Sequence, residues 1–190
     1  MKEKFYIGLD ISTSVIGISL FNNSKELIDL RNIDLRKVKC YFNKANTVRS
    51  IFNSIEKEFS ICTFDTEIFI EESLQSFRPG LSSAKTLMQL ARFNGVVSQI
   101  SYEVFRVVPV YINVNTARKS LGLKIDKKRE TNTKDQVLEW VKKDIEFNWP
   151  VKVLKSGPNK GSVKLNETCY DMADAYIICK AVLNDKSIKS

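Results

Sequence analysis

Two apolar runs separated by a short polar turn dominate the beginning of the chain, from Phe5 to Phe21 (FYIGLDISTSVIGISLF). Alternation around β-branched residues on both sides of the Ile11-Ser12-Thr13-Ser14 turn predicts two antiparallel strands of a hairpin. Asp10 falls at the end of the first strand, where an ionised carboxylate is costly unless a cation such as a divalent metal meets it. The alternative is that Asp10 only opens a turn by bonding to the nearby backbone.

The rest of the chain alternates between short apolar runs and longer stretches with helical spacing of apolar residues. The runs predict strands over 26–33, 66–70 and 107–112, and the spacing predicts helices over 44–59, from Ser82 or Ser83 to 105, over 115–121, over 133–147, and from Asn166 or Thr168 onward. A basic hairpin is expected over 151–164, around a Gly-Pro-Asn turn. This order of elements predicts one α/β domain over residues 1–190, with a central mixed sheet of about five strands flanked by helices.

Two of the expected helices have a face made of apolar or small residues. In the helix that starts near Ser82, the small residues on this face would let the helix lie close to the sheet; the face consists of Ala84, Leu87, Met88, Ala91 and Gly95. The final helix is expected to bury a stripe made of Met172, Ala175, Tyr176, Cys179 and Val182. The helix over 133–147 is expected to begin with a capping box formed by Thr133 and Gln136.

Composition narrows the class of protein. Hydrophobic residues make up 43% of the 190 residues, with only 7 Gly and 4 Pro, which argues against disorder. No apolar run approaches the ~20 residues of a membrane helix, and the N-terminus lacks the pattern of a secretory signal. We therefore expect a soluble intracellular protein, in the host-cell cytoplasm if the chain is viral. The four cysteines lack CxxC spacing and there is no histidine, so buried thiols are expected rather than a zinc site or disulfides; they are Cys40, Cys62, Cys169 and Cys179.

The positive charge is concentrated in one third of the chain. Between Arg106 and Lys164 there are fourteen Lys and Arg against six Asp and Glu, which accounts for the whole net charge of +8. A segment of this kind is typical of a protein that binds a polyanion, most often nucleic acid, although a solvated lysine face is the alternative.

Further carboxylates follow the second buried strand and begin the last helix. Glu71 and Glu72 end the strand over 66–70, and Asp171 and Asp174 are three residues apart, so they share one face of a helix. Acidic residues also suit a helix N-terminus, which is the alternative for the aspartates. Four clustered carboxylates would require cations, and oxygen ligands of this kind suit Mg²⁺ or Mn²⁺. Two such ions ~4 Å apart can hydrolyse a phosphodiester without a histidine base.

These residues carry a resemblance to a known family. Asp10 in GLDISTSVIG, Glu71 in IFIEESL, and DMADA with Asp171 and Asp174 resemble, in order and interval, the four acidic motifs of the RuvC-type Holliday junction resolvases of the ribonuclease H-like superfamily. The resemblance spans nearly the whole chain. It implies a ribonuclease H-like fold and a homodimer that nicks opposed strands of a four-way DNA junction symmetrically, using two Mg²⁺ or Mn²⁺ ions per site.

Basic residues extend the resemblance, which places two of them beside the scissile phosphate. They are Lys119, ten residues after Pro109, and Lys134 at a predicted helix start. The residues expected to contact DNA are Phe77, Arg78, Lys85, Arg118, Lys119, Lys127, Lys128, Arg129 and Lys134. The resemblance also implies that the long helix from Ser82 to Phe105 forms the dimer contact.

The chain departs from the family pattern in two places. Leu74 stands where the family has a stacking aromatic residue, so Phe77 is either a displaced wedge or a core residue. The basic hairpin over 151–164 looks like an insertion that brings the chain nearer to viral, phage and organellar branches. The family pattern places the glutamate directly after the last apolar residue of the strand, which favours Glu71 over Glu72 as the ligand.

Three other functions compete with junction resolution. A different ribonuclease H-like nuclease, acting on RNA–DNA hybrids or in repair, is the nearest alternative, and a DNA-binding module without catalytic activity is another. The first motif also resembles the phosphate-binding hairpin of sugar kinases and actin-like ATPases. Those proteins need two such domains, and they prefer glycine where this turn has Ser12.

Overall fold

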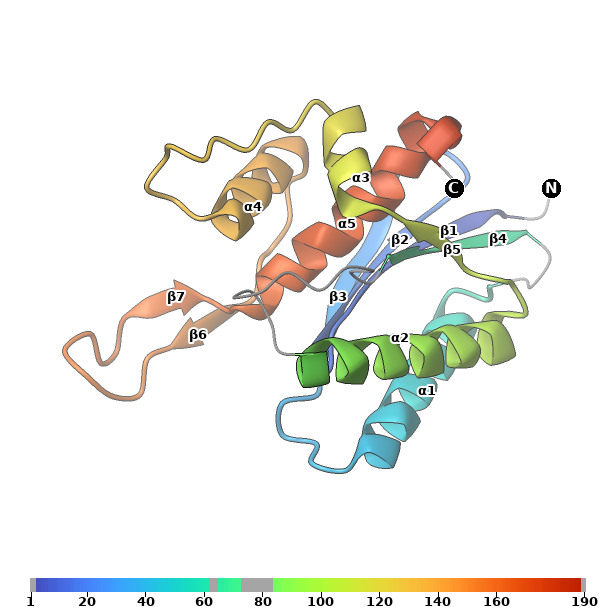
Figure 1. Ribbon diagram of the computed structural model, residues 1–190, viewed down its shortest axis with the longest axis horizontal. Coiled ribbons are helices and arrows are strands. Elements are labelled where there is room, and N and C mark those ends of the chain that lie inside the picture. Colours follow the sequence, from blue (N-terminus) through green and yellow to red (C-terminus); the bar gives the residue numbers. More distant parts are fainter. Residues whose placement is uncertain (1–2, 62–64, 73–83, 189–190) are drawn as a thin grey trace.

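A computed structural model describes residues 3–61, 65–72 and 84–188 of the chain. Its centre is a five-stranded sheet with the order β3-β2-β1-β4-β5 (Figure 1). β1, β2 and β3 are antiparallel neighbours, whereas β4 and β5 run parallel to β1, which confirms the predicted mixed sheet. The strands are β1 (Phe5–Ile11), β2 (Val15–Phe21), β3 (Leu27–Asp34), β4 (Thr66–Glu71) and β5 (Val110–Ile112).

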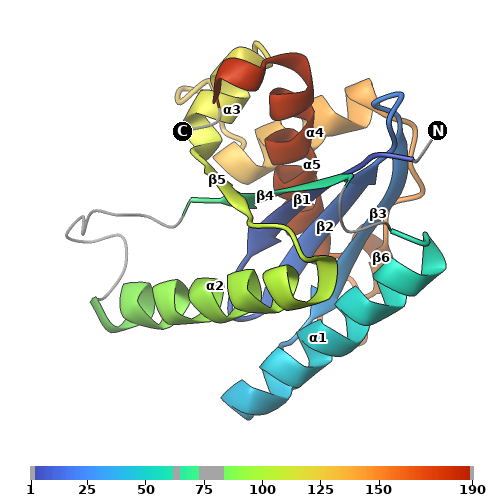
Figure 2. The same ribbon diagram turned by 90° about the vertical axis from the view of Figure 1, so that its right-hand side faces the viewer.

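Helices cover both faces of the sheet. Figure 2 shows α1 and α2 on one face and α3, α4 and α5 on the other. The helices are α1 (Tyr41–Glu58), α2 (Ala84–Phe105), α3 (Val114–Ser120), α4 (Thr133–Asp144) and α5 (Thr168–Asn184), followed by a short 3-10 helix, η1 (Lys186–Ile188). None of the helices in the described ranges has the length and apolarity needed to cross a membrane.

Successive side chains of β1 point alternately into two different hydrophobic cores. Ile7 and Leu9 lie in the core shared with α1 and α2, whereas Tyr6 lies in the core shared with α3, α4 and α5. Gly8 and Asp10 alternate in step with Tyr6, so both face α5. The strand therefore presents its terminal carboxylate to the helix that carries Asp171 and Asp174.

Glycines in the first hairpin let α5 lie directly on the sheet. Gly8 pairs with Ser19 and Asp10 pairs with Gly17 across the two strands. A Cβ atom on Gly17 would lie 1.9 Å from the backbone oxygen of Asp171, and one on Gly8 would lie 2.4 Å from that of Ala175. The Ser19 hydroxyl donates a hydrogen bond of 2.9 Å to the Ala175 oxygen. The hairpin therefore sets the distance between α5 and Asp10.

The predicted buried face is confirmed for α5 and is wrong for α2. The predicted core stripe of α5 is confirmed, since all five of its residues are buried. The prediction for α2 is wrong: Ala84, Met88, Ala91 and Gly95 are exposed, and the buried apolar residues are Phe93, Val97, Ile100 and Phe105. The stripe lies on the opposite face of α2 from these buried residues, and the N-terminal end of the helix extends past the sheet (Figure 2).

The cap of α4 also differs from the prediction. Asn132, not Thr133, is the N-cap, and its side chain accepts a hydrogen bond of 2.9 Å from the backbone N–H of Asp135. The Gln136 side chain is buried, accepts a hydrogen bond from the Asp126 N–H and donates to the oxygens of Asp126 and Thr131. Gln136 therefore ties the basic loop to α4 instead of capping the helix.

The cysteines divide by position. Cys169 and Cys179 are buried, as expected, but Cys40 is exposed at the N-cap of α1, so the prediction of a buried thiol is wrong there. The reason is that Cys40 precedes the N-terminal turns of α1, and the first buried residue of this helix is Val48. Cys62 lies outside the described residues.

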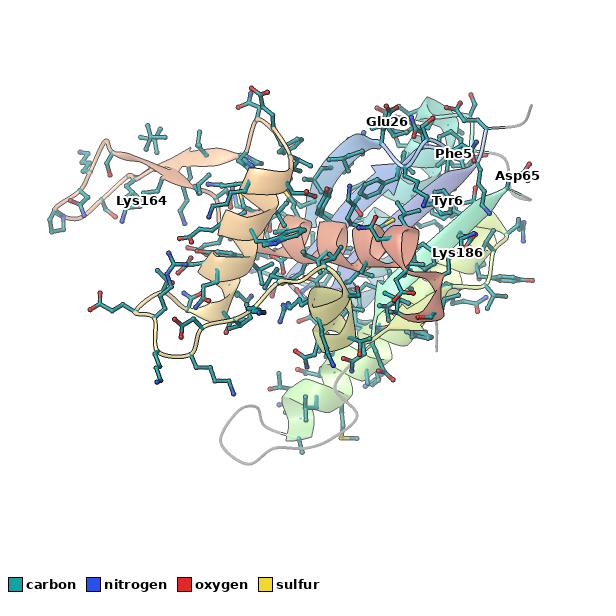
Figure 3. All side chains as sticks on the ribbon, turned by 90° about the horizontal axis from the view of Figure 1, so that it is seen from above. Phe5, Tyr6, Glu26, Asp65, Lys164 and Lys186 are labelled. Atoms are coloured by element: carbon teal, nitrogen blue, oxygen red, sulfur yellow. The ribbon has the colours of Figure 1, made fainter. Side chains whose placement is uncertain are left out.

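A basic hairpin projects from the sheet domain. β6 (Val151–Val153) and β7 (Val163–Leu165) form a separate antiparallel pair. Figure 3 shows Lys164 on this hairpin at one end of the molecule, with Glu26, Asp65 and Lys186 near the other end. All four apolar side chains of the two strands are exposed, so the hairpin adds nothing to the two cores.

Candidate active site

Two strand ends bring the first pair of predicted carboxylates together. In the parallel pairing of β1 with β4, Leu9 is the partner of Ile70, so Asp10 and Glu71 follow side by side. Their carboxyl groups are within hydrogen-bonding distance of one another. Because parallel strands end at the same edge of a sheet, a register set by buried apolar residues is enough to create this contact.

The first turns of α5 add the second pair. Asp171 and Asp174 face the same pocket as Asp10 and Glu71, and the structure thus brings all four predicted carboxylates together. This pocket has a volume of about 620 Å³. Its lining residues are Asp10, Ile11, Ser12, Glu71, Glu72, Leu90, Asn94, Val114, Arg118, Thr133, Lys134, Asp171 and Asp174.

Burial and mutual repulsion make the strand carboxyl groups weak acids. The pKa of Asp10 is raised well above its ordinary value, first by burial and then by the negative charges of Glu71, Asp174 and Asp171. Burial, followed by the charge of Asp174, also raises the pKa of Glu71. A cation between the two carboxyl groups would therefore offset both the cost of their burial and their mutual repulsion.

Asp171 is also a perturbed acid. Burial raises its pKa to about 6, although the positive charge of Lys134 opposes this rise. The Lys134 ammonium lies 5.9 Å from the ring centre of Tyr170, whose hydroxyl donates a hydrogen bond of 2.6 Å to Asp135. This bond raises the pKa of Tyr170 to about 12 and helps to hold the start of α4 against α5. Lys134 thus lines the carboxylate pocket, and its place beside a scissile phosphate stays a prediction.

Asp174, the fourth carboxylate, pairs with Arg118, which the sequence analysis assigns to DNA contact. The Arg118 guanidinium donates a hydrogen bond of 2.7 Å to Asp174, and the two side chains are only 16% and 10% exposed. The Arg118 Nε is buried and has no hydrogen-bond partner. Arg118 was expected to contact DNA and Lys119 to lie beside the reacting phosphate, but Lys119 is exposed and outside the pocket lining. On the short helix α3 these neighbours point about 100° apart, and only the packing of α3 on α5 determines which one faces the pocket.

The other predicted DNA-binding residues are dispersed. Lys85, Lys127, Lys128 and Arg129 are exposed, and Arg129 forms an ion pair of 3.0 Å with Glu139. Phe77 and Arg78 lie outside the described residues. The contact roles of all these residues stay predictions.

The donor set suits a hard divalent cation. Within the described ranges, no group of three or more carboxylate or thiol side chains is close enough together to ligate one ion as the side chains stand. Asp174 is directed to Arg118, while Asp10 and Glu71 contact each other. All four donors are carboxylate oxygens, the type that Mg²⁺ and Mn²⁺ prefer, and burial together with neighbouring carboxylates raises the pKa values of Asp10, Glu71 and Asp171, so the pocket favours added positive charge. The chemistry therefore fits Mg²⁺ or Mn²⁺, with Asp10, Glu71, Asp171 and Asp174 as its holders.

The sheet order and the helices on its two faces define a ribonuclease H-like fold. The chain is similar in structure to RuvC of Thermus thermophilus in complex with a Holliday junction substrate, with a TM-score of 0.57, 12% identity, and 97% of this chain and 95% of that chain covered. A second structure of Thermus thermophilus RuvC matches with a TM-score of 0.57 and 11% identity over 96% of this chain and 95% of that chain. The yeast mitochondrial Holliday junction resolvase Ydc2 matches with a TM-score of 0.57 and 15% identity, covering 94% of this chain and 77% of Ydc2.

At these identities the likeness is one of fold. No protein-family model matches the chain, and no curated protein matches it by sequence.

Proposed function

We propose that the protein is a structure-selective endodeoxyribonuclease that resolves four-way DNA junctions by metal-dependent hydrolysis of phosphodiesters. The observation that carries the proposal is the convergence of four carboxylates from β1, β4 and α5, with Arg118 and Lys134, in one pocket of a ribonuclease H-like fold. The basic third of the chain includes α3 and α4, which supply Arg118 and Lys134 to this pocket, and the projecting hairpin; this charge suits a polyanionic substrate.

Each residue has a defined role in this proposal. Asp10, Glu71, Asp171 and Asp174 hold the ions, whose chemistry is to activate a water and to stabilise the leaving oxygen. Lys134 lies at the rim, where an ammonium binds and orients the phosphate and offsets charge that develops in the transition state. Arg118 neutralises Asp174 inside the pocket. Because the ions replace a general base, the absence of histidine from the sequence is consistent with the mechanism.

The symmetry of the substrate calls for a homodimer. A two-fold junction presents two equivalent phosphates, and an isologous dimer brings one carboxylate pocket to each. The exposed stripe of α2 offers a surface for this contact: Met88 is 67% exposed, and the small residues Ala84, Ala91 and Gly95 are exposed on the same face. Small side chains allow two helices to approach closely, so the stripe suits a second copy of α2.

The test is a cleavage assay on three substrates of matched sequence: a labelled four-way junction, a linear duplex and an RNA–DNA hybrid, each with and without Mg²⁺. We expect paired, symmetric nicks in the junction that a ligase reseals, and little cleavage of the duplex. Asp10→Asn and Glu71→Gln are expected to abolish cleavage and to leave junction binding intact, since each removes a metal ligand but no phosphate contact. Glu72→Gln is the matched control and is expected to cleave.

Two results would contradict the proposal. Preferential cleavage of the hybrid would indicate a ribonuclease of the same fold, and junction binding without cleavage in any divalent metal would indicate a DNA-binding module. If Glu72→Gln loses activity and Glu71→Gln keeps it, the metal ligand is Glu72 and not Glu71. Sedimentation equilibrium of the junction complex measures the number of protomers, and a single bound protomer would exclude the symmetric mechanism.

A further inference from the structure

A second cavity lies against α2. Gln89, Arg92 and Val96 line it, on the other side of the helix from Leu90 and Asn94, which line the carboxylate pocket. The second cavity has a volume of about 630 Å³ and lies between the start of α1 and the middle of α2. Three cations and three aromatic residues line it, and none of its described lining residues is acidic; the six are Lys39, Lys44, Arg92, Tyr41, Phe42 and Phe93. Figure 2 shows α1 and α2 side by side with their N-terminal ends on the same side of the molecule.

The cations of this cavity have no acidic partner in the part of the chain that the structure describes. Among the described residues, Lys39, Lys44 and Arg92 take part in no ion pair, whereas Arg31, Arg36, Arg49, Arg118 and Arg129 each pair with a carboxylate. Three uncompensated cations around one concavity repel each other, and an anionic ligand such as a phosphate relieves this repulsion. The first turn of α1 contains no acidic residue, so the positive end of its helix dipole adds to the same field.

The aromatic residues give the cavity a stacking surface. Phe42 is 73% exposed, and its ring meets the ring of Tyr41 edge-on at 5.9 Å. The Arg92 guanidinium lies 5.8 Å from the centre of the Tyr41 ring, and the Tyr41 hydroxyl donates a hydrogen bond of 3.1 Å to the Arg92 backbone oxygen. Tyr41 is thus held in place, while the Phe42 ring stays open to solvent. Cations beside an open aromatic face are the combination that binds an unpaired nucleotide.

The cavity adjoins the carboxylate pocket at the turn between β1 and β2. Ser12 lines the carboxylate pocket, and the next residue, Thr13, lines the second cavity. The Lys44 ammonium donates a hydrogen bond to the Thr13 backbone oxygen, which fixes one cation of the cavity to this turn. A strand that places a phosphate over Asp10 can therefore continue across the turn into the second cavity.

We propose that this cavity binds an unpaired nucleotide of the DNA strand that passes over the carboxylate pocket, with Phe42 stacking on the base and Lys39, Lys44 and Arg92 contacting the phosphates. The inference rests on the proposed action on DNA and deepens it, because it assigns the site that holds the strand open next to the scissile phosphate. A continuous duplex offers no base face to Phe42, so the cavity selects junctions over linear DNA. The occupant is DNA rather than a second copy of this chain, because three cations line the cavity and none of its described lining residues is acidic, which favours a polyanion.

Binding tests the proposal without cleavage. The full chain with Asp10→Asn is titrated with a fluorescent four-way junction and with linear duplex, and Phe42→Ala, Phe42→Trp and Arg92→Gln are introduced into that background. Loss of one stacked base corresponds to about 10- to 100-fold weaker binding. We expect this loss for Phe42→Ala on the junction only, and near-normal binding for Phe42→Trp. Arg92→Gln is expected to reduce the slope of log K against log salt by about one.

A second readout locates the base, and two variants control for surface changes. 2-Aminopurine placed in the strand near the junction centre is expected to be quenched on binding, and Phe42→Ala is expected to relieve the quenching. Lys57→Ala removes an exposed cation at the other end of α1, and Tyr102→Ala removes an exposed aromatic residue near the other end of α2. Both are expected to bind the junction like the parent.

The outcomes separate this inference from the proposed function. Phe42→Ala and Arg92→Gln binding like the parent, with unchanged quenching, would overturn the inference even if the protein cleaves junctions. If either substitution instead halves the sedimenting mass, the cavity is a contact between copies and the inference is overturned. If no substrate is cleaved but Phe42 still controls junction binding and quenching, the proposed nuclease function fails and the nucleotide site stands.

Discussion

Replacing Asp171 by asparagine should stabilise the protein in the absence of metal. Burial raises the pKa of this carboxyl from 3.8 to about 6, so at neutral pH the folded chain carries a charge that the unfolded chain holds at lower cost. The difference of about two pH units corresponds to about 3 kcal/mol, at about 1.4 kcal/mol per unit. The asparagine amide carries no charge at any pH, so Asp171→Asn should gain up to this amount at pH 7.5.

The direction of the Asp171 pKa shift determines how the stability difference between wild type and variant depends on pH. Because the folded pKa of Asp171 is raised, the folded state binds more protons than the unfolded state between pH 3.8 and about 6. The wild-type free energy of unfolding therefore falls through this window as pH increases, and it stays low above it. The variant lacks this group, so its advantage should be near zero at pH 3.8, grow up to about pH 6 and remain constant at higher pH.

Urea unfolding in EDTA, monitored by circular dichroism at pH 4, 5, 6 and 8, measures this difference. Glu130→Gln is a control, since that side chain lies in the exposed basic loop, and it should show no comparable gain. Saturating Mg²⁺ should stabilise the wild type and not Asp171→Asn, because ligands that bind only the folded state add to its stability. Equal stability of wild type and variant at pH 8 in EDTA would refute the argument that burial makes Asp171 a weak acid.

Three further predictions concern packing and charge. Gly17→Ala should cost about 1–3 kcal/mol or more in urea unfolding, because its Cβ would meet the α5 backbone at 1.9 Å, whereas Gly95→Ala, with nothing within 4 Å, should gain up to about 1 kcal/mol. Arg118→Ala should destabilise the metal-free protein by roughly 3 kcal/mol, since it leaves Asp174 buried without its partner, whereas Lys119→Ala should change the unfolding free energy by less than about 0.5 kcal/mol. Lys134→Ala should lower the single-turnover cleavage rate more than junction affinity, and an equal loss in both would mean that Lys134 only binds DNA.

Short-range patterns predict much of the sheet because its strands are specified locally. β1 and β2 are nearly continuous apolar runs around one turn, and the apolar run of β4 stops where its carboxylates begin. Both ligand-bearing strand ends are therefore predicted by the points at which the apolar runs stop. Their meeting at one sheet edge needs the parallel pairing of β1 with β4, which no local pattern encodes.

The close approach of α5 to the sheet was missed, although a signal for it is present. Isolated glycines inside a strand indicate that another backbone comes near, and Gly8 and Gly17 both lie in such runs. Each faces the α5 backbone, and Gly17 is the strand partner of Asp10. The two glycines therefore set the depth at which Asp171 and Asp174 enter the pocket.

The stripe of small and apolar residues on α2 shows that helical spacing alone does not identify the surface on which a helix packs. Small and apolar residues at helical spacing indicate that a helix packs against something, but they do not say whether the partner is its own sheet or another molecule. Here Phe93 and Val97 face the core, whereas Met88 and Gly95 lie on the opposite face of α2 and stay exposed. These residues failed as a prediction of the core, but their exposure makes them available for the homodimer contact that the proposed symmetric cleavage requires, since each protomer would bring one carboxylate pocket.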